Sequence, residues 1–120
     1  MNVRLEKTFS FEAAHRLSQV PNEHKCSNTH GHSFVIEIII EGEVDPEKGW
    51  LRDFHDISKA WEPIHAILDH SCLNDIKGLE NPTSENLSRW LWLRLQTDLP
   101  ELTEIVVHES STSRCRYQGK

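Results

Sequence analysis

One thiol and two imidazoles lie close together in the segment CSNTHGHSF, which runs from Cys26 to Phe34. Only Gly31 separates His30 from His32. Thiolates and neutral imidazoles are both good zinc ligands. Cys26 could therefore be the fourth ligand of a closed structural site. Alternatively it lies near an open site and transfers protons, since a nearby cation lowers the pKa of a thiol toward neutrality. The pattern alone leaves both interpretations open.

A third imidazole can join this pair if the two segments that carry them are neighbouring strands. Residues 3–15 alternate between apolar and polar, and the apolar face ends at His15. The alternation resumes at His30, and side chains two residues apart in a strand share a face, so His30 and His32 point the same way. If the strands pair antiparallel across residues 16–29, all three rings converge at one end of the sheet. Three protein ligands leave the fourth position of a zinc ion open, which is typical of a catalytic site.

Two carboxylates and another imidazole are candidates for acid–base chemistry. Asp69 directly precedes His70 after a predicted helix, and an Asp beside a His can orient the ring and raise its basicity. An ordinary polar helix end is the alternative, because the helix dipole favours a histidine there, and the pattern alone favours this alternative. Glu109 follows an apolar run and matters if it faces the metal site. Four further histidines are expected at the surface, since nothing in the pattern places them together: His24, His55, His65 and His108.

The elements that must position these residues follow the order ββααββ. After the two strands, apolar residues recur at helical spacing from Phe54 to Leu68, and Pro63 is expected to kink or restart that helix. Thr83 or Ser84 can cap a second helix. Two later segments are expected to be strands, Leu102–Glu109 and Arg114–Tyr117. The predicted fold is α+β, an antiparallel sheet with two helices on one face, whose long bare edges favour an oligomer.

Length and composition predict a single domain over residues 1–120, with 37% hydrophobic and 27% charged residues. The net charge of −6 argues against nucleic acid as the main partner. No apolar run is long enough for a membrane span, and the N-terminus has no signal-peptide core, so a cytoplasmic protein is expected. Three scattered cysteines do not make a disulfide framework. Eight histidines make a metal site worth testing.

Five segments, in this order, resemble the 6-pyruvoyl-tetrahydropterin synthase family: FSFEAAHRL, CSNTHGHSF, LDHSCLND, GLENPTSENL and VVHESSTSRCRY. The resemblance covers the chain from about Phe9 to Gly119. It is closest to the bacterial branch of 6-carboxy-5,6,7,8-tetrahydropterin synthases of queuosine and deazapurine biosynthesis, because three residues separate Cys26 from the His-Gly-His triplet. The resemblance implies the tunnelling fold, in which trimers close a twelve-stranded barrel, two trimers stack as a homohexamer, and active sites lie between subunits.

The resemblance also implies roles for single residues. Cys26 matches the catalytic proton acceptor, and His70, with Asp69 beside it, matches the histidine of the proton relay. Glu109 matches the carboxylate that anchors the pterin ring and takes part in that relay. The implied ligands of a Zn²⁺ ion are His15, His30 and His32.

The implied substrate is 7,8-dihydroneopterin triphosphate. Thr83 and Ser84 occupy the helix start that meets the pterin in this family, and Arg16 and Lys25, beside the metal loop, are candidates to bind the triphosphate. The implied reaction releases triphosphate and acetaldehyde and leaves a 6-carboxyl group on the tetrahydropterin. Two alternatives stay open: a lyase that retains the side chain as 6-pyruvoyl-tetrahydropterin, and a non-enzymatic zinc module in which Cys26 is a structural ligand.

Overall fold

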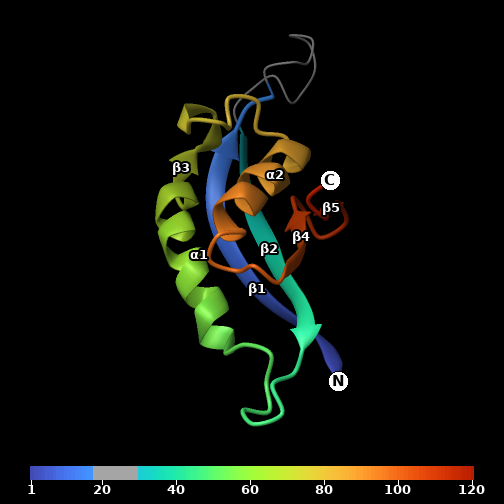
Figure 1. The fold of residues 1–120 in the computed structure, drawn as a ribbon. Coiled ribbons are helices and arrows are strands. Elements are labelled where there is room, and N and C mark those ends of the chain that lie inside the picture. Colours follow the sequence, from blue (N-terminus) through green and yellow to red (C-terminus); the bar gives the residue numbers. More distant parts are fainter. Residues whose placement is uncertain (18–29) are drawn as a thin grey trace.

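A computed structural model describes residues 1–17 and 30–120. The strands are β1 Asn2–His15, β2 His30–Glu43, β3 Ser71–Cys72, β4 Leu102–His108 and β5 Arg114–Tyr117. The helices are α1 Phe54–Leu68, α2 Ser84–Leu95 and a short 3-10 turn over Leu73–Asp75. Two helices pack against two long strands, α1 running lengthwise beside β1 and α2 lying in front of β1 and β2 in the view of Figure 1. Neither α1 nor α2 has the length and apolarity needed to cross a bilayer.

The strand order is β3-β1-β2-β4-β5, and all neighbours are antiparallel except β3, which runs parallel to β1. The fold class and the predicted order of helices and long strands are confirmed, but the sheet is five-stranded and mixed rather than purely antiparallel. The addition is β3, which pairs with Ala13 and Ala14. A strand of two residues is too short to show alternation, so no sequence pattern predicts it.

The pairing of β1 with β2 has the predicted direction and places the main chain of His15 opposite that of His30. Ala13 lies opposite His32 in the same register. Because side chains alternate in a strand, His15 and His32 lie on the helix-facing side, and this register brings them together at one end of the sheet. It is the feature of the fold on which the candidate site depends.

The core lies between the sheet and the two helices. The rings of Phe11 and Phe34 stack with centroids 5.0 Å apart, and Trp61 of α1 packs on Phe11 at 6.1 Å. Each such side chain contributes about 1.5–3 kcal/mol when it is fully buried. The apolar stripe of α1 begins at Ile57, which is fully buried. The expectation that Phe54 belongs to this stripe is wrong, because its side chain is 47% exposed at the helix start.

Both helices begin at a side-chain cap. Asp53 accepts a hydrogen bond from the main-chain N–H of His55 at the start of α1, and Thr83 accepts one from Asn86 at the start of α2. The prediction that Thr83 or Ser84 caps α2 is therefore confirmed for Thr83. Pro63 does not divide α1, which runs through it. Proline removes only one helical hydrogen bond, and the exposed position of Pro63 gives its ring room on the solvent side.

Candidate metal and acid–base site

Two of the three predicted zinc ligands meet Glu109 at one end of the sheet. His15 ends β1, His32 is the third residue of β2, and Glu109 directly follows β4. Atom Oε1 of Glu109 lies 3.5 Å from Nε2 of His32 and 4.0 Å from Nε2 of His15. The potential ligand atoms of these three residues all lie within 4.8 Å of one another. A divalent ion that prefers nitrogen and oxygen donors, such as Zn²⁺, fits this set.

His15 is held in the orientation that a metal ligand needs. Its ring is buried, and Nδ1 is 3.0 Å from the carbonyl oxygen of Pro82. A carbonyl only accepts, so Nδ1 carries the proton and the lone pair of the ring is on Nε2, which faces His32 and Glu109. The rings of His15 and His32 are 4.8 Å apart and nearly perpendicular. Metal-bound histidines typically donate their other N–H to such a carbonyl.

Glu109 is oriented by the start of α2. The hydroxyl of Ser84 donates to Oε2 of Glu109 at 2.7 Å, and the main-chain N–H of Glu109 donates to Ser113 across the turn into β5. Of the two residues predicted to meet the substrate, Thr83 thus caps α2, while Ser84 contacts the carboxylate. One oxygen of Glu109 faces the two imidazoles and the other faces Ser84.

Asp69 and His70 form an oriented pair on the other side of β1. Oδ2 of Asp69 accepts a hydrogen bond from Nδ1 of His70 at 2.8 Å, and Oδ1 accepts one from the main-chain N–H of Glu12 at 2.9 Å. The main-chain N–H of His70 donates to the carbonyl of Glu12 at 2.5 Å. The hydrogen bond from Glu12 is the largest cause that lowers the pKa of Asp69, and His70 lowers it further. The ionised carboxylate keeps the proton on Nδ1, so Nε2 of His70 can accept a proton. The sequence pattern favoured an ordinary polar helix end, whereas the structure shows Asp69 hydrogen-bonded to His70.

His70 holds a left-handed main-chain conformation, with φ at +59°, and its ring is 80% exposed. This conformation is unfavourable for residues with a Cβ and costs about 1–2 kcal/mol. We therefore expect His70→Gly to be more stable than His70→Ala by about 1 kcal/mol, because glycine carries no such penalty. Urea unfolding of the two variants measures the difference. Equal free energies of unfolding would show that the position is not strained.

Replacing Asp69 by asparagine changes the tautomer of His70 while the side chain at position 69 keeps its place. In Asp69→Asn the side-chain oxygen can still accept from Glu12, whereas the new NH₂ group donates to the ring of His70 and favours the tautomer with the proton on Nε2. We expect turnover to fall about 10–100-fold, as part of the contribution of a positioned acid or base. The ring ¹⁵N shifts of His70 report the tautomer. An unchanged tautomer with unchanged turnover would contradict the orienting role of Asp69.

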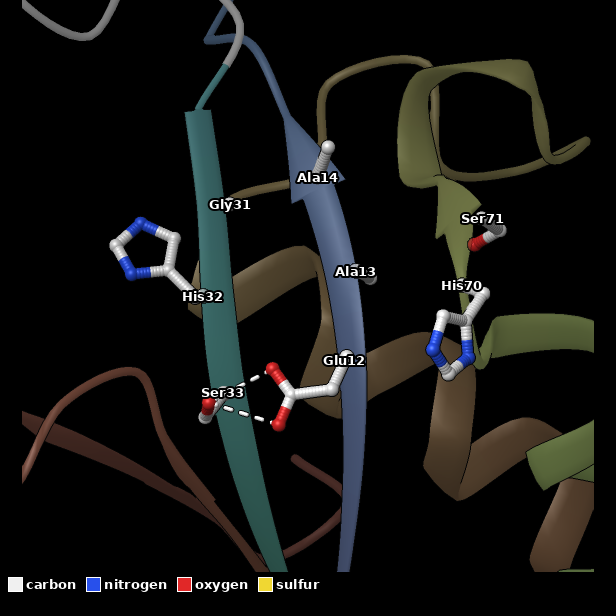
Figure 2. A pocket seen from close by; sticks show the side chains of 8 residues that line it. All are labelled: Glu12, Ala13, Ala14, Gly31, His32, Ser33, His70 and Ser71. Carbon is white, nitrogen blue, oxygen red and sulfur yellow. Dashed lines mark hydrogen bonds between the residues drawn. The ribbon is translucent and has the colours of Figure 1, made fainter.

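The Asp69–His70 pair and the His15/His32/Glu109 cluster do not meet within one chain. Figure 2 shows His32 on one side of the two long strands and His70 on the other, beyond β1. Between them lies a hollow of about 370 Å³ over Gly31, with Glu12 and Ser33 in its lining. The hydroxyl of Ser33 donates to the carboxylate of Glu12 at 2.7–2.8 Å. The main chain of β1 thus separates the two groups.

The other predicted site residues are only partly described. Cys26 and Lys25 lie outside the described residues, and only the main chain of His30 is described. Arg16 is exposed, and both its main-chain N–H and its carbonyl pair with the side-chain amide of Asn74, at 2.8 and 2.7 Å. The amide of Asn74 therefore holds the end of β1 just before the segment that carries the thiol.

Sequence reasoning missed several partners that lie far away in the chain. Glu12, Ser33 and Asn74 gave no signal, because each is a polar residue in an unremarkable position. The expectation that His108 is a surface residue is wrong, since its side chain is 18% exposed and Nε2 lies 2.5 Å from a carboxylate oxygen of Glu37. Glu37 is on the neighbouring strand β2, and only the pairing of β2 with β4 brings the two together.

The chain is similar to several known proteins of one family. The family model described as 6-pyruvoyl tetrahydropterin synthase matches residues 4–120. A 6-carboxy-5,6,7,8-tetrahydropterin synthase from Synechocystis sp. is 38% identical over 92% of this chain and 89% of that protein. A dihydroneopterin monophosphate aldolase from Pyrococcus furiosus is 35% identical over 83% of this chain and 81% of its own length. The solved structure of Caenorhabditis elegans 6-pyruvoyl tetrahydropterin synthase superposes with a TM-score of 0.92 at 28% identity, over 100% of this chain and 97% of that one.

Proposed function

This chain belongs to the 6-pyruvoyl tetrahydropterin synthase family, and on that basis we propose that it is a zinc-dependent 6-carboxy-5,6,7,8-tetrahydropterin synthase. Its substrate is 7,8-dihydroneopterin triphosphate, and its products are the carboxylated tetrahydropterin, triphosphate and acetaldehyde. We place the reaction in the cytoplasm, on the route to queuosine and other deazapurines. The observation that supports this most is the buried His15 beside His32 and Glu109, a donor set suited to Zn²⁺.

The residues of the chain divide the chemistry among them. His15, His30 and His32 would hold the ion, which would supply Lewis-acid polarisation of the hydroxyl oxygens of the substrate side chain. Glu109 accepts hydrogen bonds from an N–H and the amino group of the pterin ring, and such charge-assisted contacts are short and orienting.

Two further residues move protons. Cys26, as a thiolate, removes a proton from the side-chain carbon next to a hydroxyl. The Nε2 atom of His70 accepts and returns protons at the neighbouring carbon, while Asp69 keeps the imidazole in the required tautomer. Triphosphate leaves, and the bond between the first two side-chain carbons is then cleaved with one water molecule. The water supplies the second oxygen of the 6-carboxyl group and a hydrogen to the departing acetaldehyde. Arg16 and Lys25 are the basic residues that we propose for the triphosphate.

The second candidate is a lyase that stops at 6-pyruvoyl-tetrahydropterin. It is supported by relatives named 6-pyruvoyl tetrahydrobiopterin synthase, which are 33% identical in Drosophila melanogaster and 30% identical in Homo sapiens. We favour the carboxypterin product because the Synechocystis relative is more similar, at 38%. A purely structural zinc module has less support, since these relatives are all named as enzymes.

One incubation tests the proposal. Purified, zinc-loaded protein is mixed with 7,8-dihydroneopterin triphosphate, the pterin product is identified by mass, and acetaldehyde is assayed separately. We expect a carboxylated tetrahydropterin and acetaldehyde in equal amounts. A pyruvoyl side chain without aldehyde would establish the second candidate instead, and an unchanged substrate would contradict both.

We further propose that the protein is a homohexamer, two stacked trimers whose sheets close a barrel. The edges of the sheet support this assembly. In the described part of the chain, β1 pairs on its outer side only at Ala13 and Ala14, and β5 forms the opposite edge. The strands β1, β2, β4 and β5 alternate in direction, so β5 of one copy can pair antiparallel with β1 of the next and bury both edges.

A mixing experiment tests whether one active site uses two copies of the chain. His32→Ala lacks an ion ligand and His70→Ala lacks the relay imidazole, so each variant alone is expected to be inactive. If the ion of one copy works with His70 of another, co-expression in equal amounts restores about a quarter of wild-type turnover, by random assembly of a symmetric oligomer. Absence of any recovery in a mixed oligomer of confirmed composition would place both groups in one chain.

A further inference from the structure

Glu109 is placed to bind the ion as well as the pterin. We propose that in the substrate-free enzyme Oε1 of Glu109 is a fourth, exchangeable ligand of the metal, which the substrate displaces. This inference rests on the proposed function, because it concerns the same site. It assigns Glu109 a second role, and it makes Ser84 a positioning residue for that role.

Glu109 lies at a distance from the two imidazoles that suits ligands of one zinc ion. Two ligands of a tetrahedral zinc ion, each ~2.0–2.1 Å from the metal, are ~3.3–3.4 Å apart. Oε1 of Glu109 lies 3.5 Å from Nε2 of His32, which matches that spacing closely. Its 4.0 Å separation from Nε2 of His15 is wider, so binding to one ion would bring Glu109 closer to His15.

Ser84 limits how the carboxylate binds. Its hydroxyl donates to Oε2 at 2.7 Å, so that oxygen is occupied and only Oε1 faces the imidazoles. Glu109 can therefore contribute one ligand atom but not two. Ser84 is the first residue of α2, and the cap at Thr83 fixes the helix start that carries it. The carboxylate is thus tethered on the side away from the ion.

Exposure identifies Glu109 as the member of the cluster that exchanges. His15 is 1% and His32 is 23% exposed in their side chains, whereas Glu109 is 32% exposed. Both histidines sit within the paired part of the sheet, while Glu109 stands just beyond the end of β4. A substrate can therefore reach Glu109 more readily than either imidazole.

The exchange would couple binding of the pterin ring to release of one ligand position on the ion. When the hydroxyls of the substrate take the place of Oε1, the carboxylate is released close to the ring and can accept the ring donors. Until then the carboxylate fills the position that water would otherwise take. No covalent bond forms or breaks in this step, because one oxygen ligand replaces another.

The zinc affinity of Glu109 variants tests the ligand role of Glu109 independently of turnover. We expect Glu109→Gln to bind Zn²⁺ about tenfold more weakly than wild type in competition with a chelator, because a carboxylate ligand is replaced by a weaker amide. Glu80→Gln removes the same charge from the loop before α2, where the carboxylate of Glu80 accepts from the main-chain N–H of Gly78. This control is expected to keep wild-type affinity. Equal affinities of Glu109→Gln and wild type would overturn the inference.

Cobalt substitution shows the exchange itself, because four-coordinate Co²⁺ absorbs visible light much more strongly than five- or six-coordinate Co²⁺. Ser84→Ala frees Oε2 to bind as well, so we expect its substrate-free bands to be weaker than those of wild type. Neopterin, which carries the ring and a hydroxylated side chain, should change the wild-type spectrum and change that of Glu109→Gln less. Identical responses of the two proteins to neopterin would contradict exchange.

These readouts separate the inference from the proposed function. If Glu109→Gln loses turnover but keeps zinc affinity and the cobalt spectrum, Glu109 is only the ring anchor and the proposed reaction stands. If wild type fails to convert 7,8-dihydroneopterin triphosphate but Glu109→Gln loses zinc affinity, the reaction is wrong and the ligand role stands.

Discussion

His32→Ala is expected to lose the metal ion and turnover together. The variant retains two of the three imidazoles that we propose as ligands, and the ion then has too few strong donors to stay bound at low concentration. Loss of Lewis-acid stabilisation worth several kcal/mol corresponds to a decrease in kcat/KM of about 10³-fold or more. Zinc content by elemental analysis and consumption of 7,8-dihydroneopterin triphosphate are measured on the same preparation.

A matched control is His55→Ala, which removes an exposed imidazole at the start of α1, far along the chain from the site. It is expected to keep both zinc and turnover. His32→Ala is also expected to stay folded, because its ring meets Phe34 edge-on at 5.5 Å while the packing of Phe11 on Phe34 and Trp61 remains. A folded His32→Ala protein that is free of zinc yet fully active would rule out the metal mechanism.

Cys26→Ala is expected to keep its zinc and its oligomeric state while kcat falls about 10²–10⁴-fold, the range for a general acid or base. The reason is that a proton acceptor, unlike a ligand, contributes to the transition state but not to ion binding. Zinc content, size in solution and turnover of one preparation test the three parts of this expectation. The pH profile of wild type should contain a thiol ionisation that the variant lacks.

Cys115→Ala is the control for this thiol. Cys115 is partly buried in β5, where its sulfur lies 3.8 Å from the hydroxyl of Ser88, and it has no place in the proposed chemistry. If Cys26→Ala loses its zinc, the thiol is a structural ligand and the site is closed. That result would also overturn the exchangeable role of Glu109, because no ligand position would remain for the carboxylate.

The sequence by itself determined the part of the site that depends on local periodicity. Alternation of period two fixed which residues of β1 and β2 face the helices, and the direction of the pair then brought His15 opposite His30. The sequence also predicted a cap at Thr83 or Ser84, because a hydroxyl before a helix accepts from main-chain N–H groups only a few residues away. The structure selects Thr83. Such features involve neighbours in the chain or a repeating pattern, so the sequence carries them directly.

Only the tertiary structure decided which distant groups meet. Glu109 reaches His15 and Ser84, and Asp69 reaches the main chain of Glu12, across separations of 94, 25 and 57 residues. These contacts depend on how the helices pack on the sheet and on which rotamers that packing allows. Periodicity reports the face on which a residue lies but not the partner that its side chain finds. The convergence of His15 and His32 could therefore be predicted from the pattern, while the hydrogen bond from Ser84 to Glu109 and the one from the main chain of Glu12 to Asp69 could not.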